Sequence, residues 1–311
     1  MNETDFNQIN QLINEVEKVI LGKRKIIQLT VAALLAGSHV LFEDIPGVGK
    51  TVLVKSLAKA IHGDFSRIQF TPDLLPSDIL GVSIFNAKSN DFEFHSGPIF
   101  ANILLADEIN RTTPRTQAAL LEAMSENSVT IDGHTYPLPP NFLVLATQNP
   151  LDYEGTYPLP EAQLDRFLFS LNIGYPSVEN ELKLMLNQPK TADSVKQVMN
   201  EDTIRKLKIQ LDNIHVDEAV ARYALALVQK SRNHPSVELG LSPRGSIAFI
   251  RGAKAFAMTE GRSFVTPNDL QSILPAVFKH RLQLKSRNVK RNNLLEITDD
   301  IINSVPIPFK R

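Results

Sequence analysis

A loop rich in glycine has the residue types and the order that proteins use to hold a phosphate group. Its residues Gly47-Val48-Gly49-Lys50-Thr51 follow a short apolar run, His39 to Phe42, and open a helical pattern. In such a strand–loop–helix unit, backbone N–H groups face the anion, Lys50 reaches the β- and γ-phosphates, and the Thr51 hydroxyl is a ligand for Mg²⁺. The general pattern has glycine where this chain has Asp44. The alternative is that the loop only ends a strand.

Two acidic residues end a second apolar run. Ile103 to Ala106 leads directly into Asp107 and Glu108. Asp107 can hold Mg²⁺ through a water molecule, and Glu108 can orient and polarise an attacking water. The alternative is that the two acids only cap the next helix. A phosphate-binding loop followed by a second acidic strand indicates nucleotide hydrolysis.

A third apolar run, Phe142 to Ala146, continues through Thr147 and Gln148 into Asn149. Parallel sheets bind ligands beyond the carboxyl ends of their strands. We therefore expect Asn149 to point toward the γ-phosphate and its water. The alternative is an ordinary turn asparagine before proline.

The elements that would position these residues alternate along the chain. Residues 1 to about 36 have helical spacing of apolar residues. Short strands are predicted at His39–Phe42, Arg67–Phe70, Ile99–Ala106, Phe142–Ala146 and Phe167–Ile173, separated by polar or helical stretches. This alternation predicts a mostly parallel sheet with helices on both of its faces.

Two hairpins are predicted within this alternation. The first has alternating residues around Asp132-Gly133, which is a typical two-residue turn. The second has Ile84-Phe85 and Phe92 to Phe94 on either side of Ser89-Asn90-Asp91. The strand signals end after Tyr175-Pro176, and helices are predicted from there on, with Ser177 as the first N-cap. We expect an α/β domain over residues 1–176 and a helical domain over residues 177–311.

Composition excludes several classes of protein. The 311 residues are 43% hydrophobic and 22% charged, which fits a folded chain of about two domains. The net charge of −1 provides no global attraction for nucleic acid or membranes, and the absence of cysteine excludes disulfides and thiolate metal sites. There is neither a signal-peptide pattern nor an apolar run long enough to span a bilayer. We expect a cytoplasmic protein.

The motifs and their order resemble the MoxR family of AAA+ ATPases over nearly the whole chain. The matching segments are FEDIPGVGKT (42–51), LADEINR (105–111), ATQNP (146–150), LPEAQLDRF (159–167) and LSPRG (241–245). The resemblance implies a three-layer α/β/α P-loop core with a mostly parallel sheet, followed by an all-α lid. It also implies a helix-2 insert at about 76–97 and a pre-sensor-1 hairpin at about 126–140, which face the central pore in related rings.

The resemblance also assigns roles to individual residues. It implies a Walker A loop, a Walker B pair at Asp107 and Glu108, and sensor 1 at Asn149. Ile20 and Gly22 match an apolar-Gly segment that lies against adenine, although Gly22 could equally be a simple helix break. The residues expected to bind the nucleotide are Ile20, Gly22, Pro46, Gly47, Val48, Gly49, Lys50, Thr51 and Val52, with Thr51 and Asp107 at the Mg²⁺.

Two arginines complete the site that the resemblance implies. The resemblance implies that Arg166 is an arginine finger, and its place just before a strand agrees with reaching a neighbour's nucleotide. Arg244 follows Ser242-Pro243 at a helix start and would be the sensor 2 arginine in the lid. A guanidinium suits both roles, since it is always charged and binds phosphate oxygens in a fork. The alternative for each is a surface ion pair. Arg111 and Arg115 are further candidates to face a neighbour.

The implied function is an ATP- and Mg²⁺-dependent ring, expected to be a hexamer. It would remodel a protein client, with a von Willebrand factor A domain as one expected partner feature, or insert a metal cofactor. One alternative is a DNA-directed AAA+ motor or regulator, and another is a nucleotide switch that does not hydrolyse ATP. The basic stretch Lys279 to Arg291 would bind nucleic acid under the first alternative; otherwise it is a solvated lid surface or a subunit contact.

Overall fold

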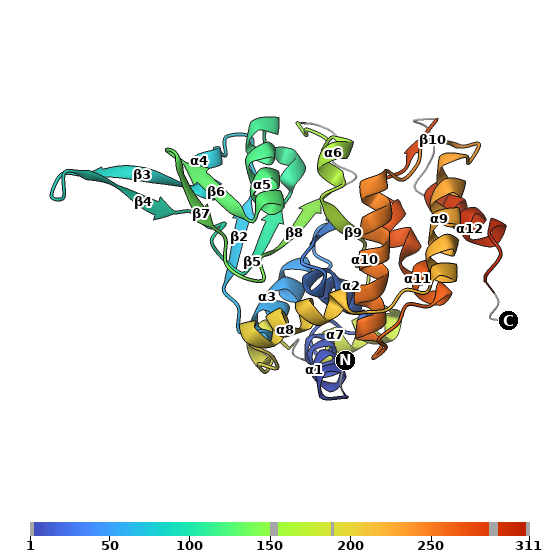
Figure 1. The fold of residues 1–311 in the computed structure, drawn as a ribbon. Coiled ribbons are helices and arrows are strands. Elements are labelled where there is room, and N and C mark those ends of the chain that lie inside the picture. Colours follow the sequence, from blue (N-terminus) through green and yellow to red (C-terminus); the bar gives the residue numbers. More distant parts are fainter. Residues whose placement is uncertain (1–2, 150–154, 188–189, 286–291, 309–311) are drawn as a thin grey trace.

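The computed structural model describes residues 3–149, 155–187, 190–285 and 292–308. Five strands form one parallel sheet in the order β2-β5-β8-β1-β9 (Figure 1). All but the edge strand β2 are largely buried, as parallel strands covered on both faces are. This confirms the predicted parallel sheet. The strands are β1 His39–Glu43, β2 Phe65–Gln69, β5 Ile103–Asp107, β8 Leu143–Gln148 and β9 Phe167–Leu171.

Helices cover both faces of the sheet and so confirm the three-layer core. Alternate strand residues face opposite sides, so that Val40 and Phe42 join one buried cluster while Leu41 joins the other. The first cluster lies under α1 Glu3–Glu17, α2 Arg24–Leu35 and α3 Lys50–Ala60, and the second under α4 Pro76–Leu80 and α5 Pro114–Glu126. A short helix, α6 Glu161–Leu164, precedes β9.

One predicted strand is shorter than its apolar run. The run begins at Ile99, but β5 begins only at Ile103. Residues 97–102 instead form turns in which the backbone N–H of Ile99 donates to the carbonyl of Ile79 at 3.2 Å. Ile99 is fully buried beside α4. The apolar run therefore starts before the strand because Ile99 packs in the buried cluster beside α4.

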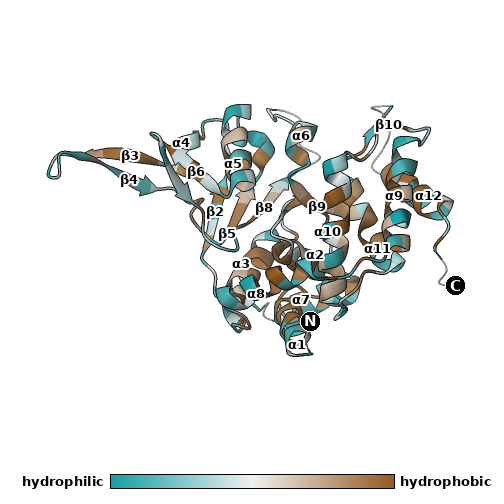
Figure 2. Cartoon of the chain, viewed as in Figure 1, coloured by the Kyte–Doolittle hydropathy of each residue, from teal (hydrophilic) through white to brown (hydrophobic). Residues whose placement is uncertain are grey.

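Both predicted hairpins are present. β3 Gly81–Asn86 pairs with β4 Asp91–Ser96, and β6 Ser128–Ile131 pairs with β7 His134–Pro137. Asp132 and Gly133 both have positive φ, at 52° and 80°, as the tight turn requires. The β3–β4 hairpin extends away from the body of the molecule (Figure 1). Its strand β3 is hydrophobic (Figure 2), and Phe85 near its tip is 50% exposed.

The chain after β9 is mainly helical. The helices are α7 Val178–Leu186, α8 Glu201–Asp212, α9 Glu218–Arg232, α10 Pro243–Thr259, α11 Pro267–Phe278 and α12 Asn292–Ser304. Ser177 caps α7 as predicted, because its hydroxyl accepts from the N–H of Asn180 at 3.4 Å. A short antiparallel pair, β10 Val237–Leu239 with β11 Gln283–Leu284, departs from the prediction that no strand follows residue 176. In the described part of the chain, no helix is long and apolar enough to cross a membrane.

The helical region packs directly on the edge strand β9. A Cβ added to Gly252 of α10 would lie 3.3 Å from both Phe169 of β9 and Ile273 of α11. This close contact requires glycine or a shift of the neighbours. The buried cluster on this side runs without a break from the sheet into the lid. The two predicted domains therefore share one buried cluster, and the boundary between them at residue 176 stays a prediction.

Candidate functional site

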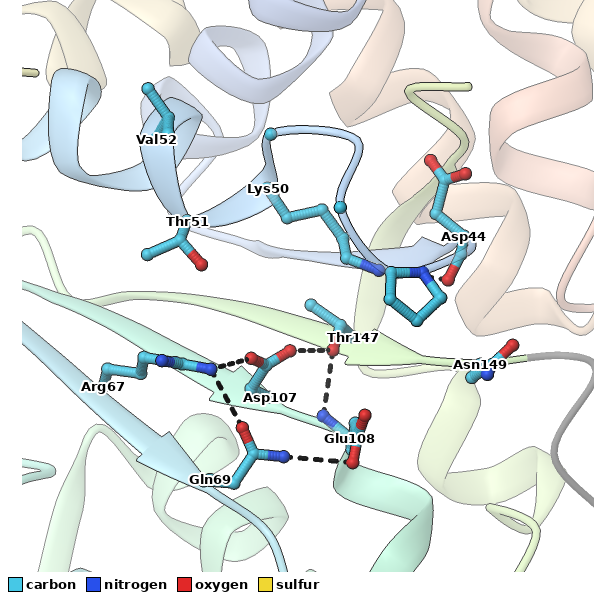
Figure 3. A pocket seen from close by; sticks show the side chains of 13 residues that line it. Asp44, Lys50, Thr51, Val52, Arg67, Gln69, Asp107, Glu108, Thr147 and Asn149 are labelled. Carbon is cyan, nitrogen blue, oxygen red and sulfur yellow. Dashed lines mark hydrogen bonds and ion pairs between the residues drawn. The ribbon is translucent and has the colours of Figure 1, made fainter. Parts of the chain in front are cut away.

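The glycine loop joins the end of β1 to the start of α3. Gly47 and Gly49 have φ of +84° and +97°, a conformation that glycine adopts without strain. A Cβ on Gly47 would meet no atom within 4 Å, so there is open space beside the backbone here. Helix α3 begins at Lys50, and its N-terminal end faces the same space (Figure 3). The loop thus has the open cradle that a phosphate chain needs.

Lys50 lies inside the loop. Its Nζ donates to the carbonyl oxygens of Asp44 at 3.0 Å and Ile45 at 3.1 Å. Burial lowers the pKa of Lys50, and three nearby carboxylates oppose this shift, those of Asp44, Asp107 and Glu108. The ammonium is therefore held by weak neutral acceptors close to where an anion would bind.

Asp44 explains why this loop lacks its first glycine. Its buried carboxylate accepts hydrogen bonds from the N–H groups of Ile45 at 3.2 Å, of Ile173, and of Gly174 at 3.0 Å. Ile173 and Gly174 follow β9, so Asp44 ties the start of the loop to the segment that leads into the lid. The departure from the general pattern is a structural link between two parts of the site.

A cavity of about 400 Å³ opens beside the loop (Figure 3). It brings together nine residues that the sequence predicted, from three separate segments: Pro46, Gly47, Gly49, Lys50, Thr51, Val52, Asp107, Glu108 and Asn149. Four further residues line it that the sequence reasoning did not place there: Asp44, Arg67, Gln69 and Thr147. Arg67 and Gln69 come from β2 and Thr147 from β8.

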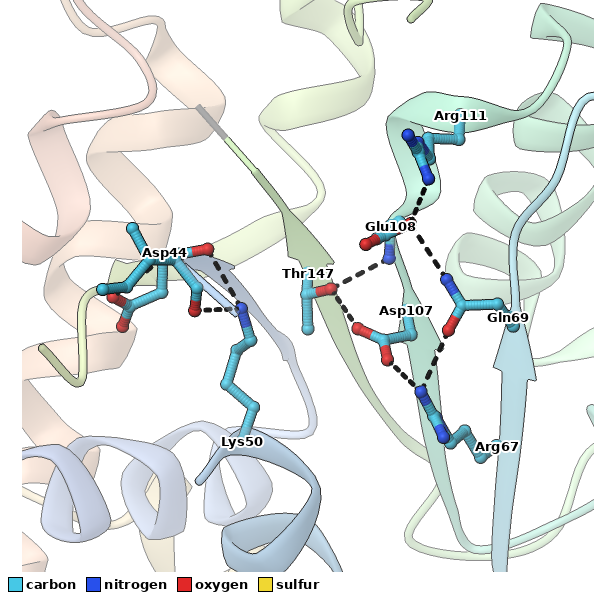
Figure 4. Close-up of polar contacts among 9 residues, drawn as sticks. Asp44, Lys50, Arg67, Gln69, Asp107, Glu108, Arg111 and Thr147 are labelled. Carbon is cyan, nitrogen blue, oxygen red and sulfur yellow. Dashed lines mark hydrogen bonds and ion pairs between the residues drawn. The ribbon is translucent and has the colours of Figure 1, made fainter. Parts of the chain in front are cut away.

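The acidic residues are held by an array of polar side chains (Figure 4). Asp107 accepts a hydrogen bond from the Thr147 hydroxyl at 2.6 Å on Oδ1 and pairs with Arg67 at 2.6 Å on Oδ2. The Thr147 oxygen in turn accepts from the N–H of Glu108 at 2.9 Å. β5 and β8 are thus fixed to each other at their carboxyl ends.

Glu108 has two donors on one carboxylate oxygen. Its Oε2 accepts from Gln69 Nε2 at 3.0 Å and from Arg111 Nη1 at 3.1 Å. Arg111 lies in a short 3-10 helix, Ile109–Arg111, that follows Glu108. Glu108 itself has φ of +58° and ψ of +48°, which costs a residue other than glycine about 1–3 kcal/mol. Strain of this kind is concentrated at functional sites.

The residues present fit Mg²⁺ and a nucleotide triphosphate. The Thr51 side chain and the Asp107 carboxylate lie on opposite walls of the cavity and present hard oxygen donors (Figure 3). The open space beside Gly47 and the ammonium of Lys50 fit the phosphate groups. These residues would hold the metal ion and the phosphates.

A second cavity of about 570 Å³ adjoins the first and shares four residues with it, Pro46, Gly47 and Gly49 of the loop and Val52 of α3. Ile20 and Val48 also line it. A Cβ on Gly22 would lie 2.2 Å from Nδ2 at the end of the Asn180 side chain, which would have to move, and the φ of +70° at Gly22 itself favours glycine. The predicted adenine-binding segment therefore lies beside the loop.

The two predicted arginines lie outside both cavities. Arg166 donates from Nη1 to the carbonyl of Leu121 in α5 at 2.6 Å. Arg244 is exposed in the first turn of α10, whose N-cap Ser242 accepts from Gly245 N at 2.9 Å. Their predicted catalytic roles stay predictions. Arg111, a candidate to face a neighbour, pairs with Glu108 of its own chain, and its role at an interface stays a prediction.

The first cations of the basic stretch form ion pairs within the chain. Lys279 pairs with Glu43 at 2.6 Å, and Arg281 pairs with Asp165 at 2.6 Å. Arg281 is buried and also donates to backbone carbonyls of β9. These two cations therefore join the lid to the sheet, and neither forms a solvated lid surface. Residues 286–291 lie outside the described residues.

Comparisons with known proteins point to one family. A model of the ATPase family associated with various cellular activities (AAA) matches residues 39–169, and a model of the AAA lid domain matches residues 229–305. The chain is 50% identical over 306 residues to YeaC, an uncharacterized protein of Bacillus subtilis. The matched segment covers 97% of this chain and 96% of the relative.

Two further relatives and one solved structure agree. The chain is 41% identical to Chaperone MoxR1 of Mycobacterium tuberculosis, over 90% of this chain and 77% of the relative. It is 28% identical to Protein MoxR of Paracoccus denitrificans, over 93% of each. The crystal structure of a candidate ATPase from Cytophaga hutchinsonii has a TM-score of 0.89 and 37% identity, and covers 98% of this chain and 96% of its own. Such identity over nearly the whole length is more than a shared fold: the chain belongs to the MoxR family of AAA+ ATPases.

Proposed function

We propose that this chain binds ATP with Mg²⁺ and hydrolyses it. The observation that carries this proposal is that Lys50, Thr51 and the acidic pair Asp107-Glu108 line one cavity beside the open cradle at Gly47. These groups come from the glycine loop, the start of α3 and the end of β5, and each has the chemistry that phosphoryl transfer needs. The adjoining cavity beside Ile20 would hold the adenine.

Each residue has a separate task in this proposal. Lys50 leaves its two carbonyl acceptors and binds the β- and γ-phosphates. Mg²⁺, held by Thr51 and by Asp107 through water, would neutralise charge on the phosphates. Glu108 orients the attacking water and accepts its proton, and Asn149 orients the γ-phosphate and the water. Both side chains line the cavity, as these tasks require.

The proposed assembly is a ring, expected to be a hexamer. Arg166 would reach the nucleotide of a neighbouring subunit, and Arg244 would approach the nucleotide when the lid closes. The position of Arg166 outside the cavities of its own chain is compatible with action in trans. The arginine would add transition-state charge stabilisation that a single subunit lacks.

The proposed substrate of the ring is a protein. One relative carries the name chaperone, and the projecting β3–β4 hairpin presents Phe85 and Phe92, which are 50% and 67% exposed. A client with a von Willebrand factor A domain, or insertion of a metal cofactor into the client, belongs to this proposal. A DNA-directed motor is disfavoured by the net charge of −1 and by the internal pairing of Lys279 and Arg281.

Phosphate release from ATP by the full chain tests the activity. We expect hydrolysis that requires Mg²⁺ and stops when the metal is chelated. Lys50→Ala should abolish ATP binding and hydrolysis, because it removes the cation that contacts the two terminal phosphates. Lys55→Ala is the matched control, since Lys55 lies exposed on the same helix. Tight ATP binding by the wild-type chain without turnover would instead support the nucleotide switch.

A further inference from the structure

Arg67 is a cation at the metal side of the site that the proposed function does not use. It lies on β2, the edge strand of the sheet, next to β5. Its side chain crosses toward the acidic residues and lines the cavity (Figures 3 and 4). Nη2 lies 2.6 Å from Asp107 Oδ2 and 2.9 Å from Gln69 Oε1. A single nitrogen thus contacts both an acid expected to hold Mg²⁺ and the residue that holds Glu108.

The contact with Gln69 also fixes how that amide is turned. A guanidinium can only donate hydrogen bonds, so the Gln69 atom facing Arg67 must be the carbonyl oxygen. The NH₂ group of Gln69 must then face Glu108, whose Oε2 it contacts at 3.0 Å. A carboxylate can accept this bond but an amide oxygen facing Glu108 could not donate one. Arg67 is therefore linked to Asp107 directly and to Glu108 through Gln69.

We propose that Arg67 is the internal counter-ion of Asp107 in the metal-free protein and that it competes with Mg²⁺ for this carboxylate. A metal ion near Asp107 and a guanidinium 2.6 Å from the same carboxylate repel each other at short range. Binding of the metal then favours departure of Arg67. The side chain of Arg67 is 47% exposed on an edge strand, so it can turn into solvent without leaving a buried charge behind.

The bond from Gln69 to Glu108 does not depend on Arg67, because the carboxylate of Glu108 still requires the NH₂ group of Gln69 to face it. The role proposed for Arg67 therefore concerns the charge of Asp107. A purely structural ion pair between β2 and β5 would affect stability and leave metal affinity unchanged.

Binding of Mn²⁺ to the nucleotide-free full chain tests the proposal without any activity measurement. Mn²⁺ takes oxygen ligands as Mg²⁺ does and is followed by electron paramagnetic resonance. Arg67→Gln removes the charge, and we expect it to bind Mn²⁺ about three- to tenfold more tightly than wild type. Arg67→Lys keeps a charge and should stay close to wild type. Arg222→Gln is the matched control, since it removes a cation from an exposed ion pair in the lid.

A double-mutant cycle with Asp107→Asn makes the test specific. If Arg67 acts on the charge of Asp107, the gain from Arg67→Gln should vanish when Asp107 is an amide. Equal Mn²⁺ binding by Arg67→Gln and wild type, whether both bind or neither does, overturns the proposal. A gain that persists in Asp107→Asn overturns it as well. Circular dichroism checks folding, and Arg67→Met serves as the uncharged variant if Arg67→Gln does not fold.

This inference rests on the proposed metal site, but the two can fail separately. If the wild-type chain does not hydrolyse ATP while Arg67→Gln binds Mn²⁺ more tightly through Asp107, the proposed activity is wrong and the counter-ion role stands. If the chain hydrolyses ATP while Arg67→Gln leaves Mn²⁺ affinity unchanged, only the role of Arg67 is wrong.

Discussion

At the residue scale, Glu108 joins a reactive side chain to an unfavourable backbone conformation. Its φ is +58°, and its carboxylate is held between Gln69 and Arg111. The neighbouring strand β8 supports this conformation, because the hydroxyl of Thr147 accepts from the Glu108 N–H. The strained backbone at Glu108 lowers stability but fixes the position of its carboxylate, which is expected where a side chain must be placed accurately.

We expect Glu108→Gln to retain ATP binding while lowering turnover by about 10²- to 10⁴-fold, because an amide keeps the shape of the carboxylate but is a very poor base. Equilibrium binding of ATP and phosphate release measure the two effects separately. Glu122→Gln on the exposed face of α5 is the control for loss of one carboxylate. Turnover of Glu108→Gln within a few-fold of wild type would remove Glu108 from the role of base.

The loop and the acidic pair could be predicted from the sequence because each is a local pattern with a known chemistry. Arg67 and Gln69 could not, because their partners lie about forty residues away along the chain. A signal for Gln69 does exist: it ends a strand, as Asp107 and Gln148 do. The sequence does not reveal which strands are neighbours, so it could not show that β2 lies beside β5.

At the element scale, His39 joins three parts of the core. Its Nδ1 accepts from the N–H of Val144 in β8 at 3.0 Å, so Nε2 carries the proton and donates to the carbonyl of Met124 in α5 at 3.2 Å. Burial lowers the pKa of His39 from 6.5 to about 4. Protonation of Nδ1 would both bury a charge and break the bond to β8.

This histidine predicts acid sensitivity of the fold. Because the pKa is lower in the folded chain, the unfolded chain binds the proton first as the pH falls. The contribution of His39 to the free energy of unfolding is fully present above about pH 6.5 and is lost as the pH falls toward 4. The loss amounts to about 2 kcal/mol by pH 5. Urea unfolding at pH 7 and pH 5 measures this change. His280, whose pKa burial also lowers, adds to it in the same direction.

Substitution separates His39 from the other titrating groups. His39→Gln should be less stable than wild type at pH 7 but should lose less stability between pH 7 and pH 5. His95→Gln is the control, since His95 is exposed on the β3–β4 hairpin. An unchanged pH dependence in His39→Gln would show that other groups cause the acid sensitivity.

Hydrophobic periodicity predicted which segments form helices and strands, but it could not predict the partners of the lysines and arginines in the basic stretch. Its composition is compatible with nucleic acid, solvent or a neighbouring subunit as the partner. The structure instead pairs Lys279 with Glu43 and Arg281 with Asp165, next to the glycine loop and the start of β9. Charge count along a sequence does not indicate whether a lysine or arginine meets its partner inside the same chain, because that depends on how the lid packs.

At the scale of the whole molecule, Arg166 decides whether one chain holds a complete site. In this chain it contacts the carbonyl of Leu121, and its Nε is buried without a hydrogen-bond partner. The local alternative is that Arg166 only ties α5 to the start of β9. If it serves a neighbour instead, a single subunit lacks one contact to the transition state, of a kind worth about 10³ to 10⁵ in rate.

The trans role predicts that activity depends on assembly. Specific ATPase activity should rise cooperatively with protein concentration as subunits associate, because each new interface completes a site. Arg166→Ala should bind ATP nearly as wild type does and stay slow at every concentration. Its free energy of unfolding must be measured alongside, since loss of the bond to Leu121 would lower stability under either role. Arg205→Ala is the matched control, because Arg205 is an exposed arginine on α8 that is not a candidate to face a neighbour.

Mixing two inactive variants separates the roles most sharply. Arg166→Ala keeps an intact glycine loop, and Lys50→Ala keeps the arginine, so a subunit of the first beside one of the second has every group between them. In a head-to-tail ring formed from equal amounts, about a quarter of the interfaces would have this arrangement. We expect partial recovery of phosphate release in the mixture, although neither parent is active. The local role predicts no recovery, because each chain would then need its own Arg166. Inactive mixtures with proven subunit exchange, together with activity independent of concentration, would contradict both the trans-acting arginine and the ring.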